Sequence, residues 1–232
     1  MIKKLIIISA VVVALLSVSS MVIAVEFGAN SANVTNRYLS TKVGAWSLSI
    51  GAGNWTGLVS YSHAVGTEIV SGAKIGTQTF NNVKCLKVNL TYTEDDDFMT
   101  LWAAQDTQGN VWFLKVYSLK NDTTHMLGTD FKSMVMPAVP HVGDPVGITI
   151  PETGTDYCQC MEVDKSLNTN FGSYDSCIKA HCFHESNTEV EYYCPDVGMV
   201  RASTVGNPGN VIDLKEYGIA TDTKAVVIPL GD

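Results

Sequence analysis

The sequence predicts an all-β protein built from a curved antiparallel sheet or half-barrel, and two observations support this. First, apolar and polar residues alternate from Lys84 to Leu90, so that Leu86, Val88 and Leu90 share one face. Alternation with a period of two is typical of a half-buried strand. Second, the best helical candidate, residues 211–217, is short and has no clear cap. Strands are therefore expected to dominate the fold.

Two stretches of the sequence resemble each other and suggest a duplicated unit. Residues 80–88 and residues 174–180 each lead into an aromatic hairpin, the first turning at 106–110 and the second at 195–198. Each unit could bury one face of its strands only by packing on, or continuing, the other. The sequence therefore predicts two related strand-and-hairpin halves.

The N-terminal residues have the pattern of a signal peptide. A cationic start at Lys3 and Lys4 precedes an apolar run over residues 5–16, and a small-residue segment ends at Ala24. This pattern predicts a signal peptide over residues 1–24, cleaved after Ala24. An uncleaved anchor is the alternative, since apolar residues extend far enough to span a bilayer. Cleavage is favoured because serines interrupt the second half and no basic stop follows.

The remaining residues, 25–232, are expected to form a single β-rich domain. Its halves would cover residues 25–134 and 155–220, joined by a proline-rich connection over residues 135–154. The chain of 232 residues has a formal net charge of −8 at pH 7, and loss of the signal peptide makes it more negative. An acidic chain without basic clusters is not suited to nucleic acid. We expect a periplasmic or extracellular protein with no stable membrane insertion after signal cleavage.

The six cysteines are the strongest chemical signal of the mature chain. An even number of cysteines in an exported protein predicts disulfides, for which six cysteines allow fifteen connectivities. A tight turn at residues 186–188 would place Cys182 opposite Cys194 on the buried side, with Glu189 and Glu191 pointing away. The predicted disulfide is therefore Cys182–Cys194. The pairing of the others stays open, and these are Cys85, Cys158, Cys160 and Cys177.

Metal binding and catalysis are not indicated. Cys158-x-Cys160 has cysteines and histidines downstream, but their spacing matches no standard zinc finger. The acidic run at residues 94–97 lacks the alternating carboxylates and the glycine of a calcium loop. No nucleophile elbow, phosphate loop or zinc-protease motif is present. A catalytic triad assembled in space stays open, but we expect a protein that is not an enzyme and has no cofactor.

Several short motifs resemble those of a loosely defined group of exported bacterial proteins of uncharacterised function. The matching residues are Tyr38–Ser40 with Gly44–Trp46, Ala104–Asp106 with Gly109–Phe113, Met136–Ala138 with Gly143-Asp144, Gly172-x-Tyr174-x-x-Cys177-Ile178-Lys179, and Tyr192-Tyr193-x-Pro195-x-Val197–Val200. Cys194 stands where the group usually has alanine, and Asp196 where it usually has glycine. The resemblance implies, at the level of fold, similarity to the curved sheets of lipoprotein carriers such as LolA and LolB.

Two functions are compatible with these features. In the first, the concave face of the sheet binds a lipid or other apolar small molecule. The candidate lining residues for this role are Trp46, Phe98, Trp102, Trp112, Phe113 and Tyr192. In the second, the protein is a structural or surface-interaction component that contacts another envelope protein, and the same aromatics fill its core. An internal cavity would favour the first function, whereas a filled interior and a flat exposed edge strand would favour the second.

The first prediction concerns processing. The exported protein should begin at Val25, because Val22-Ile23-Ala24 has the form of a cleavage site. The intact mass of protein recovered from the extracytoplasmic fraction checks this. A mass that still includes residues 1–24 would identify an anchored protein instead.

Overall fold

The computed structural model describes residues 24–39, 41–92, 98–120, 122–129, 134–147, 157–184 and 187–220. The strands nearest the N-terminus are β1 (Ala45–Ala52), β2 (Val59–Val70), β3 (Ala73–Ile75), β4 (Gln78–Phe80), β5 (Val83–Tyr92), β6 (Phe98–Gln105), β7 (Val111–Ser118) and β8 (Thr123–Met126). They are followed by β9 (Met134–Met136), β10 (Tyr157–Asn168), β11 (Ser173–Phe183), β12 (Thr188–Cys194), β13 (Gly198–Thr204) and β14 (Asn207–Ile219). A short 3₁₀ helix, η1, covers Gly53–Trp55.

Residues 1–23 of the predicted signal peptide and the acidic run at 94–97 lie outside the described residues. Within the described residues, no helix has the length and apolar character needed to cross a membrane.

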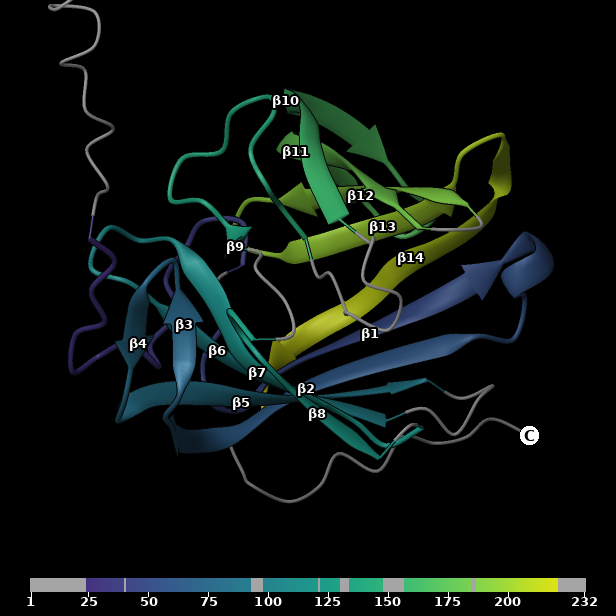
Figure 1. Cartoon of the computed structure of the whole chain (residues 1–232). Coiled ribbons are helices and arrows are strands. Elements are labelled where there is room, and N and C mark those ends of the chain that lie inside the picture. The colour runs from purple at the N-terminus through teal and green to yellow at the C-terminus, as the bar shows by residue number, and fades with distance from the viewer. Residues whose placement is uncertain are drawn as a thin grey trace, which may run out of the picture.

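The fold is nearly all β, as the sequence predicts. One antiparallel sheet of 12 strands has the order β10-β11-β12-β13-β14-β1-β2-β5-β6-β7-β8, with β9 beside β7, and β3–β4 form a separate ribbon. Figure 1 shows β10–β13 on one side of a bend and β5–β8 on the other, with β14 and β1 between them. The sheet is not closed into a barrel, because its end strands β8 and β10 do not pair with each other. Large twisted sheets tend to curl in this way.

Along β5, Leu86 and Leu90 are buried in the main core as the alternation predicts, but Cys85, predicted on the opposite face, is fully buried as well. The best helical candidate, residues 211–217, is instead part of β14. This segment is a strand because it pairs with β1 along its length and Val211–Asp213 also pair with β13, so neighbouring strands satisfy its backbone groups. Pairing with neighbouring strands thus determines the conformation of this segment, whose own sequence has no helix cap.

The β6–β7 turn lies at residues 106–110, where the sequence predicts it. Asp106 is buried and organises this turn through its carboxylate. Its Oδ1 accepts hydrogen bonds from the backbone N–H of Gln108 and Asn110, at 3.0 and 2.9 Å. Its Oδ2 accepts from the indole Nε1 of Trp112 at 2.9 Å. A buried carboxylate is tolerated when it is bonded in this way.

The β12–β13 turn also lies where the sequence predicts it. Asp196 has φ of 63°, in the left-handed region. Aspartate adopts this region more readily than most residues, because its short polar side chain can bond locally to the backbone. The left-handed conformation that this turn requires is therefore tolerated by Asp196 although it is not a glycine. The duplication of the two halves itself stays a prediction.

The N-terminal segment, residues 24–39, spans both sides of the bend. The Gln105 side-chain oxygen, at the end of β6, accepts from the backbone N–H of Thr35 and Asn36 at 2.7 and 2.9 Å. On the other side, Asp196 N–H donates to the Arg37 carbonyl at 2.7 Å. The segment therefore holds together two parts of the sheet that do not pair directly.

The disulfides are Cys158–Cys182 and Cys177–Cys194, so the predicted Cys182–Cys194 pair is wrong. The register of β11 and β12 is the reason. Cys182 lies opposite Glu189, whereas Cys194 lies just beyond the Ile178–Tyr193 pair, beside Cys177. This register also places Glu189 and Glu191 on the same side of the sheet as Cys182, not pointing away from it.

The two other cysteines, Cys85 and Cys160, are buried and are not in disulfides. Burial raises the pKa of the Cys85 thiol to about 12. Burial also raises the pKa of Cys160. Because the thiolate is the reactive form, both thiols should react slowly in the folded protein.

Peptide mapping under non-reducing conditions should therefore recover the Cys158–Cys182 and Cys177–Cys194 peptides. Cys85 and Cys160 should be alkylated only after denaturation. Replacing both Cys177 and Cys194 by serine should lower the free energy of unfolding by about 3 kcal/mol, from loss of a short loop constraint. Recovery of a Cys182–Cys194 peptide would contradict this assignment.

Candidate functional site

A cavity of about 600 Å³ lies within the bend of the sheet. Small-molecule sites in proteins have volumes of roughly 300–1,000 Å³. Its lining includes residues from β1, β2, β5, β6, β7, β12, β13 and β14, and from the N-terminal segment. The cavity is therefore a property of the whole curved sheet and not of one hairpin.

One wall of the cavity is apolar. Strands β5, β6 and β7 contribute it, and their lining residues are Val88, Leu90, Tyr92, Leu101, Ala103, Val111 and Phe113. These side chains share one face of their strands because side chains alternate across a sheet. Val34 and Leu39 of the N-terminal region add apolar surface.

The neighbouring wall, on β1 and β2, carries hydroxyl groups. Ser47 and Ser49 on β1 face the cavity, and their strand partners Ser62 and Ser60 on β2 face it too. The hydroxyl oxygens of Ser47 and Ser62 are 2.6 Å apart and form a hydrogen bond. The cavity therefore combines a large apolar surface with a row of small polar groups.

Exposed residues mark where the cavity meets solvent. They include Lys42, Asp196, Tyr217 and Ile219. Lys42 is exposed at this rim and forms no ion pair with the residues that the structure describes.

Of the six aromatic residues predicted to line a binding face, Trp46 and Phe113 line this cavity. Phe98, Trp102, Trp112 and Tyr192 do not. Trp112 directly precedes Phe113 on β7, so its side chain lies on the opposite face of the strand. There its indole Nε1 donates a hydrogen bond to the Asp106 carboxylate. Tyr192 packs instead with the second apolar cluster, around Cys177 and Cys194.

Trp102 is buried in a charged network away from the cavity. The ammonium groups of Lys115 and Lys87 lie 4.0 and 5.4 Å from the centre of its ring. Both lysines also lie 3.6 Å from the Glu68 carboxylate. The two lysine ammonium groups thus make cation–π contacts with this indole, and their ion pairs with Glu68 hold them beside it. Trp102 is therefore a packed residue that does not face the cavity.

Sequence reasoning missed the small residues of the lining. A search for large aromatics overlooks alanine and serine, although small side chains are what leaves a cavity open. The signal was present as Ser47-x-Ser49 and Ser60-x-Ser62-x-Ala64, where small residues repeat with the period of a strand face.

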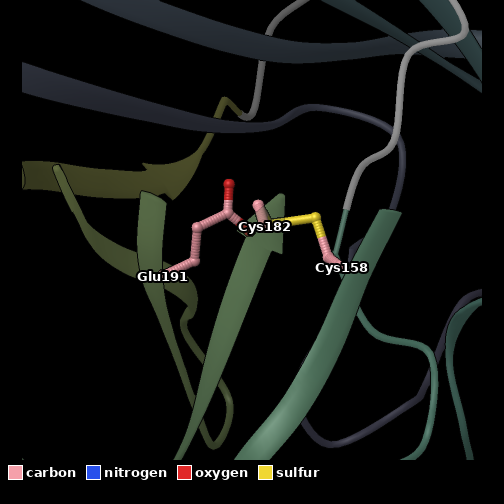
Figure 2. Close-up of side chains that lie close together, drawn as sticks. All are labelled: Cys158, Cys182 and Glu191. Carbon is pink, nitrogen blue, oxygen red and sulfur yellow. A yellow bond between two sulfur atoms is a disulfide. The ribbon is translucent and has the colours of Figure 1, made fainter. Parts of the chain in front are cut away.

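A second cluster lies on β10, β11 and β12. Figure 2 shows the Glu191 side chain reaching from β12 toward the Cys158–Cys182 disulfide. One ligand-type atom from each residue lies within 4.8 Å of the other two. The Tyr193 hydroxyl donates to Glu191 Oε2 at 2.6 Å, and the residue Tyr193 also lines the cavity.

Burial raises the pKa of Glu191 to about 7, although the hydrogen bond from Tyr193 acts in the opposite direction. The negative charge of Glu189 raises it further, while His184 lowers it. Desolvation disfavours a charged carboxylate, so the proton is retained to higher pH than in an exposed glutamate.

Comparison with known proteins supplied no relatives. The chain matches no family model, and neither the curated proteins nor the solved structures yielded a match.

The pKa of Glu191 predicts a pH dependence of stability. The folded protein holds this proton between the ordinary value of 4.5 and about 7, where the unfolded chain has lost it. The free energy of unfolding should therefore fall as pH rises through this window, by at most about 3 kcal/mol. Urea unfolding at pH 5 and pH 8 measures the change.

Glu191→Gln should reduce this pH dependence, because glutamine does not titrate. Glu189→Gln, on the same strand and the same face, is the matched control and should retain most of it. Equal pH dependence in Glu191→Gln and the unmodified protein would show that another group is responsible.

Proposed function

We propose that the protein binds a lipid or other apolar ligand in the bend of its sheet, and that it does so outside the cytoplasm without catalysing a reaction. The observation that carries this proposal is the cavity of about 600 Å³ with its apolar wall. Concave, mostly apolar sites with a few polar groups are the usual form of small-molecule sites.

The lining suggests an amphipathic ligand. The apolar wall on β5–β7 suits hydrocarbon, because each buried methylene contributes about 0.8 kcal/mol. Ser49 and Ser60 face the cavity beside the Ser47–Ser62 pair, so a ligand with hydroxyl or carbonyl groups along one side would find partners. Lys42 at the rim favours an anionic end group.

Two further points support this proposal. Disulfides persist in oxidising compartments such as the periplasm or the extracellular space. The motifs that resemble those of an exported group suggest the same role by analogy with LolA- and LolB-like carriers, although no solved structure matches the fold.

The alternative, a structural or surface-interaction protein, would be favoured by a flat exposed edge. The edge strand β10 is not flat. Its pairing with β11 is interrupted at Cys160/Glu162, Glu162/Lys165 and Lys165/Leu167, and Asp164 has φ of 55°. Bulges of this kind hinder pairing with another chain.

Ligand binding can be tested with protein purified without detergent. Native mass spectrometry should show a co-purifying apolar molecule, or the empty protein should bind the fluorescent probe N-phenyl-1-naphthylamine. Ala64→Phe places a ring in the cavity and should weaken probe binding at least about tenfold, equivalent to about 1.4 kcal/mol.

Thr67→Phe is the control, because Thr67 is on the same strand but is exposed and does not line the cavity. Circular dichroism establishes that both variants are folded. Absence of a co-purifying ligand together with absence of probe binding would leave the structural alternative.

A further inference from the structure

The Cys158–Cys182–Glu191 cluster brings together three metal-ligand types in the protein interior. Cys158 and Cys182 are directly opposed on β10 and β11, and Glu191 comes from the next strand, β12. The two sulfurs and a carboxylate oxygen lie within 4.8 Å of one another. Ligand atoms around a tetrahedral zinc ion are separated by roughly 3.3–3.8 Å, so small side-chain movements would suffice.

The Glu191 carboxylate has no lysine or arginine partner among the residues that the structure describes. Its hydrogen bond comes from Tyr193, a neutral group. The nearby titratable groups are Glu189, whose negative charge repels it, and His184, which lies 3.9 Å from the Glu189 carboxylate and carries a charge only when protonated. A buried carboxyl group with no cation beside it can stay neutral by keeping its proton, as the raised pKa of Glu191 indicates, or can bind a metal ion.

The surroundings hold the cluster in place. A Cβ atom on Gly147 would lie 2.9 Å from Glu191 Oε2, 3.0 Å from Tyr193 Oη and 3.2 Å from Cys158 Cβ. The backbone at Gly147, with φ of +90°, therefore packs directly on the cluster. Metal-binding carboxylates are commonly oriented by a second hydrogen bond, and Tyr193 supplies one here.

We propose that reduction of the Cys158–Cys182 disulfide converts this cluster into a site for a thiophilic divalent cation such as Zn²⁺, bound by both sulfurs and the Glu191 carboxylate. Thiolates with a carboxylate are suitable zinc ligands, and solvent would occupy the fourth position. Oxidation closes the site, because the sulfurs are then bonded to each other.

The chemistry requires a reductant. A dithiol donates two electrons and two protons, the S–S bond breaks, two thiols form, and the dithiol becomes a disulfide. Zn²⁺ then displaces the two thiol protons to solvent as the two Zn–S bonds form. The other disulfide, Cys177–Cys194, has no carboxylate or histidine completing a comparable group among the described residues, so it is a matched control.

The test uses Co²⁺ as a spectroscopic probe, with a phosphine as the reductant: the phosphine becomes its oxide by taking oxygen from water, and that water supplies the two protons of the thiols. The reduced protein should bind one Co²⁺ and show thiolate-to-metal absorption in the near ultraviolet, whereas the oxidised protein should not. C177S/C194S should retain this absorption and C158S/C182S should lose it. Glu191→Gln should weaken binding at least about tenfold, whereas Glu189→Gln should have a smaller effect.

No thiolate absorption from the reduced protein, or equal absorption from C158S/C182S, would overturn the proposal. If reduction unfolds the chain, circular dichroism gives the second readout. Zn²⁺ should then restore the β signal only when Cys158 and Cys182 are present, and failure to restore it would also overturn the proposal. Ligand binding to the cavity is measured on oxidised protein, so the two proposals can fail independently.

Discussion

The sheet must stay bent although its two ends do not pair, and this constraint governs the rest of the structure. Strands β8 and β10 do not pair with each other, and residues 143–147 link β10 to β9 instead: Gly143 N–H donates to the Cys160 carbonyl at 2.8 Å and Gly147 N–H donates to the Val135 carbonyl at 2.7 Å. The N-terminal segment, residues 24–39, supplies part of the missing restraint through Gln105 on one side and Asp196 on the other. Asn36 extends this link, since its side-chain nitrogen donates to the carbonyls of Gly109 and Pro137 at 3.1 and 2.8 Å. Val34 and Tyr38 of the same segment are buried in the main core, so apolar packing and these polar contacts together hold the segment across the bend.

Strand parity explains which parts of the site could be predicted from the sequence. Alternation along residues 84–90 indicates both the strand and its buried face, and the structure confirms both for Leu86 and Leu90. Alternation cannot show whether a face looks into a cavity or into packed side chains. Trp112 and Phe113 are neighbours of similar character, yet only Phe113 lines the cavity. A prediction based only on aromatic residue type therefore groups together side chains that lie on opposite faces of the sheet.

Disulfide connectivity shows a second limit of the sequence. The strands that carry Cys177, Cys182 and Cys194 could be anticipated, but their register depends on where the intervening turn lies. In antiparallel strands, a shift of one residue moves every side chain to the other face. The observed register pairs Cys182 with Glu189, which separates it from Cys194 and brings Glu191 to the cysteine side. The error in the disulfide and the failure to foresee the Glu191 cluster thus have the same physical origin.

Tyr193 connects the two regions of chemical interest. The residue lines the cavity, and its hydroxyl holds the carboxylate of Glu191 beside the Cys158–Cys182 disulfide. A ligand that displaces the Tyr193 ring would also displace the donor that orients Glu191. Coupling of this kind is reciprocal, because the free energy by which binding at one site changes the affinity of the other site is the same in both directions. Binding in the cavity and chemistry at the disulfide are therefore expected to influence each other through this one side chain.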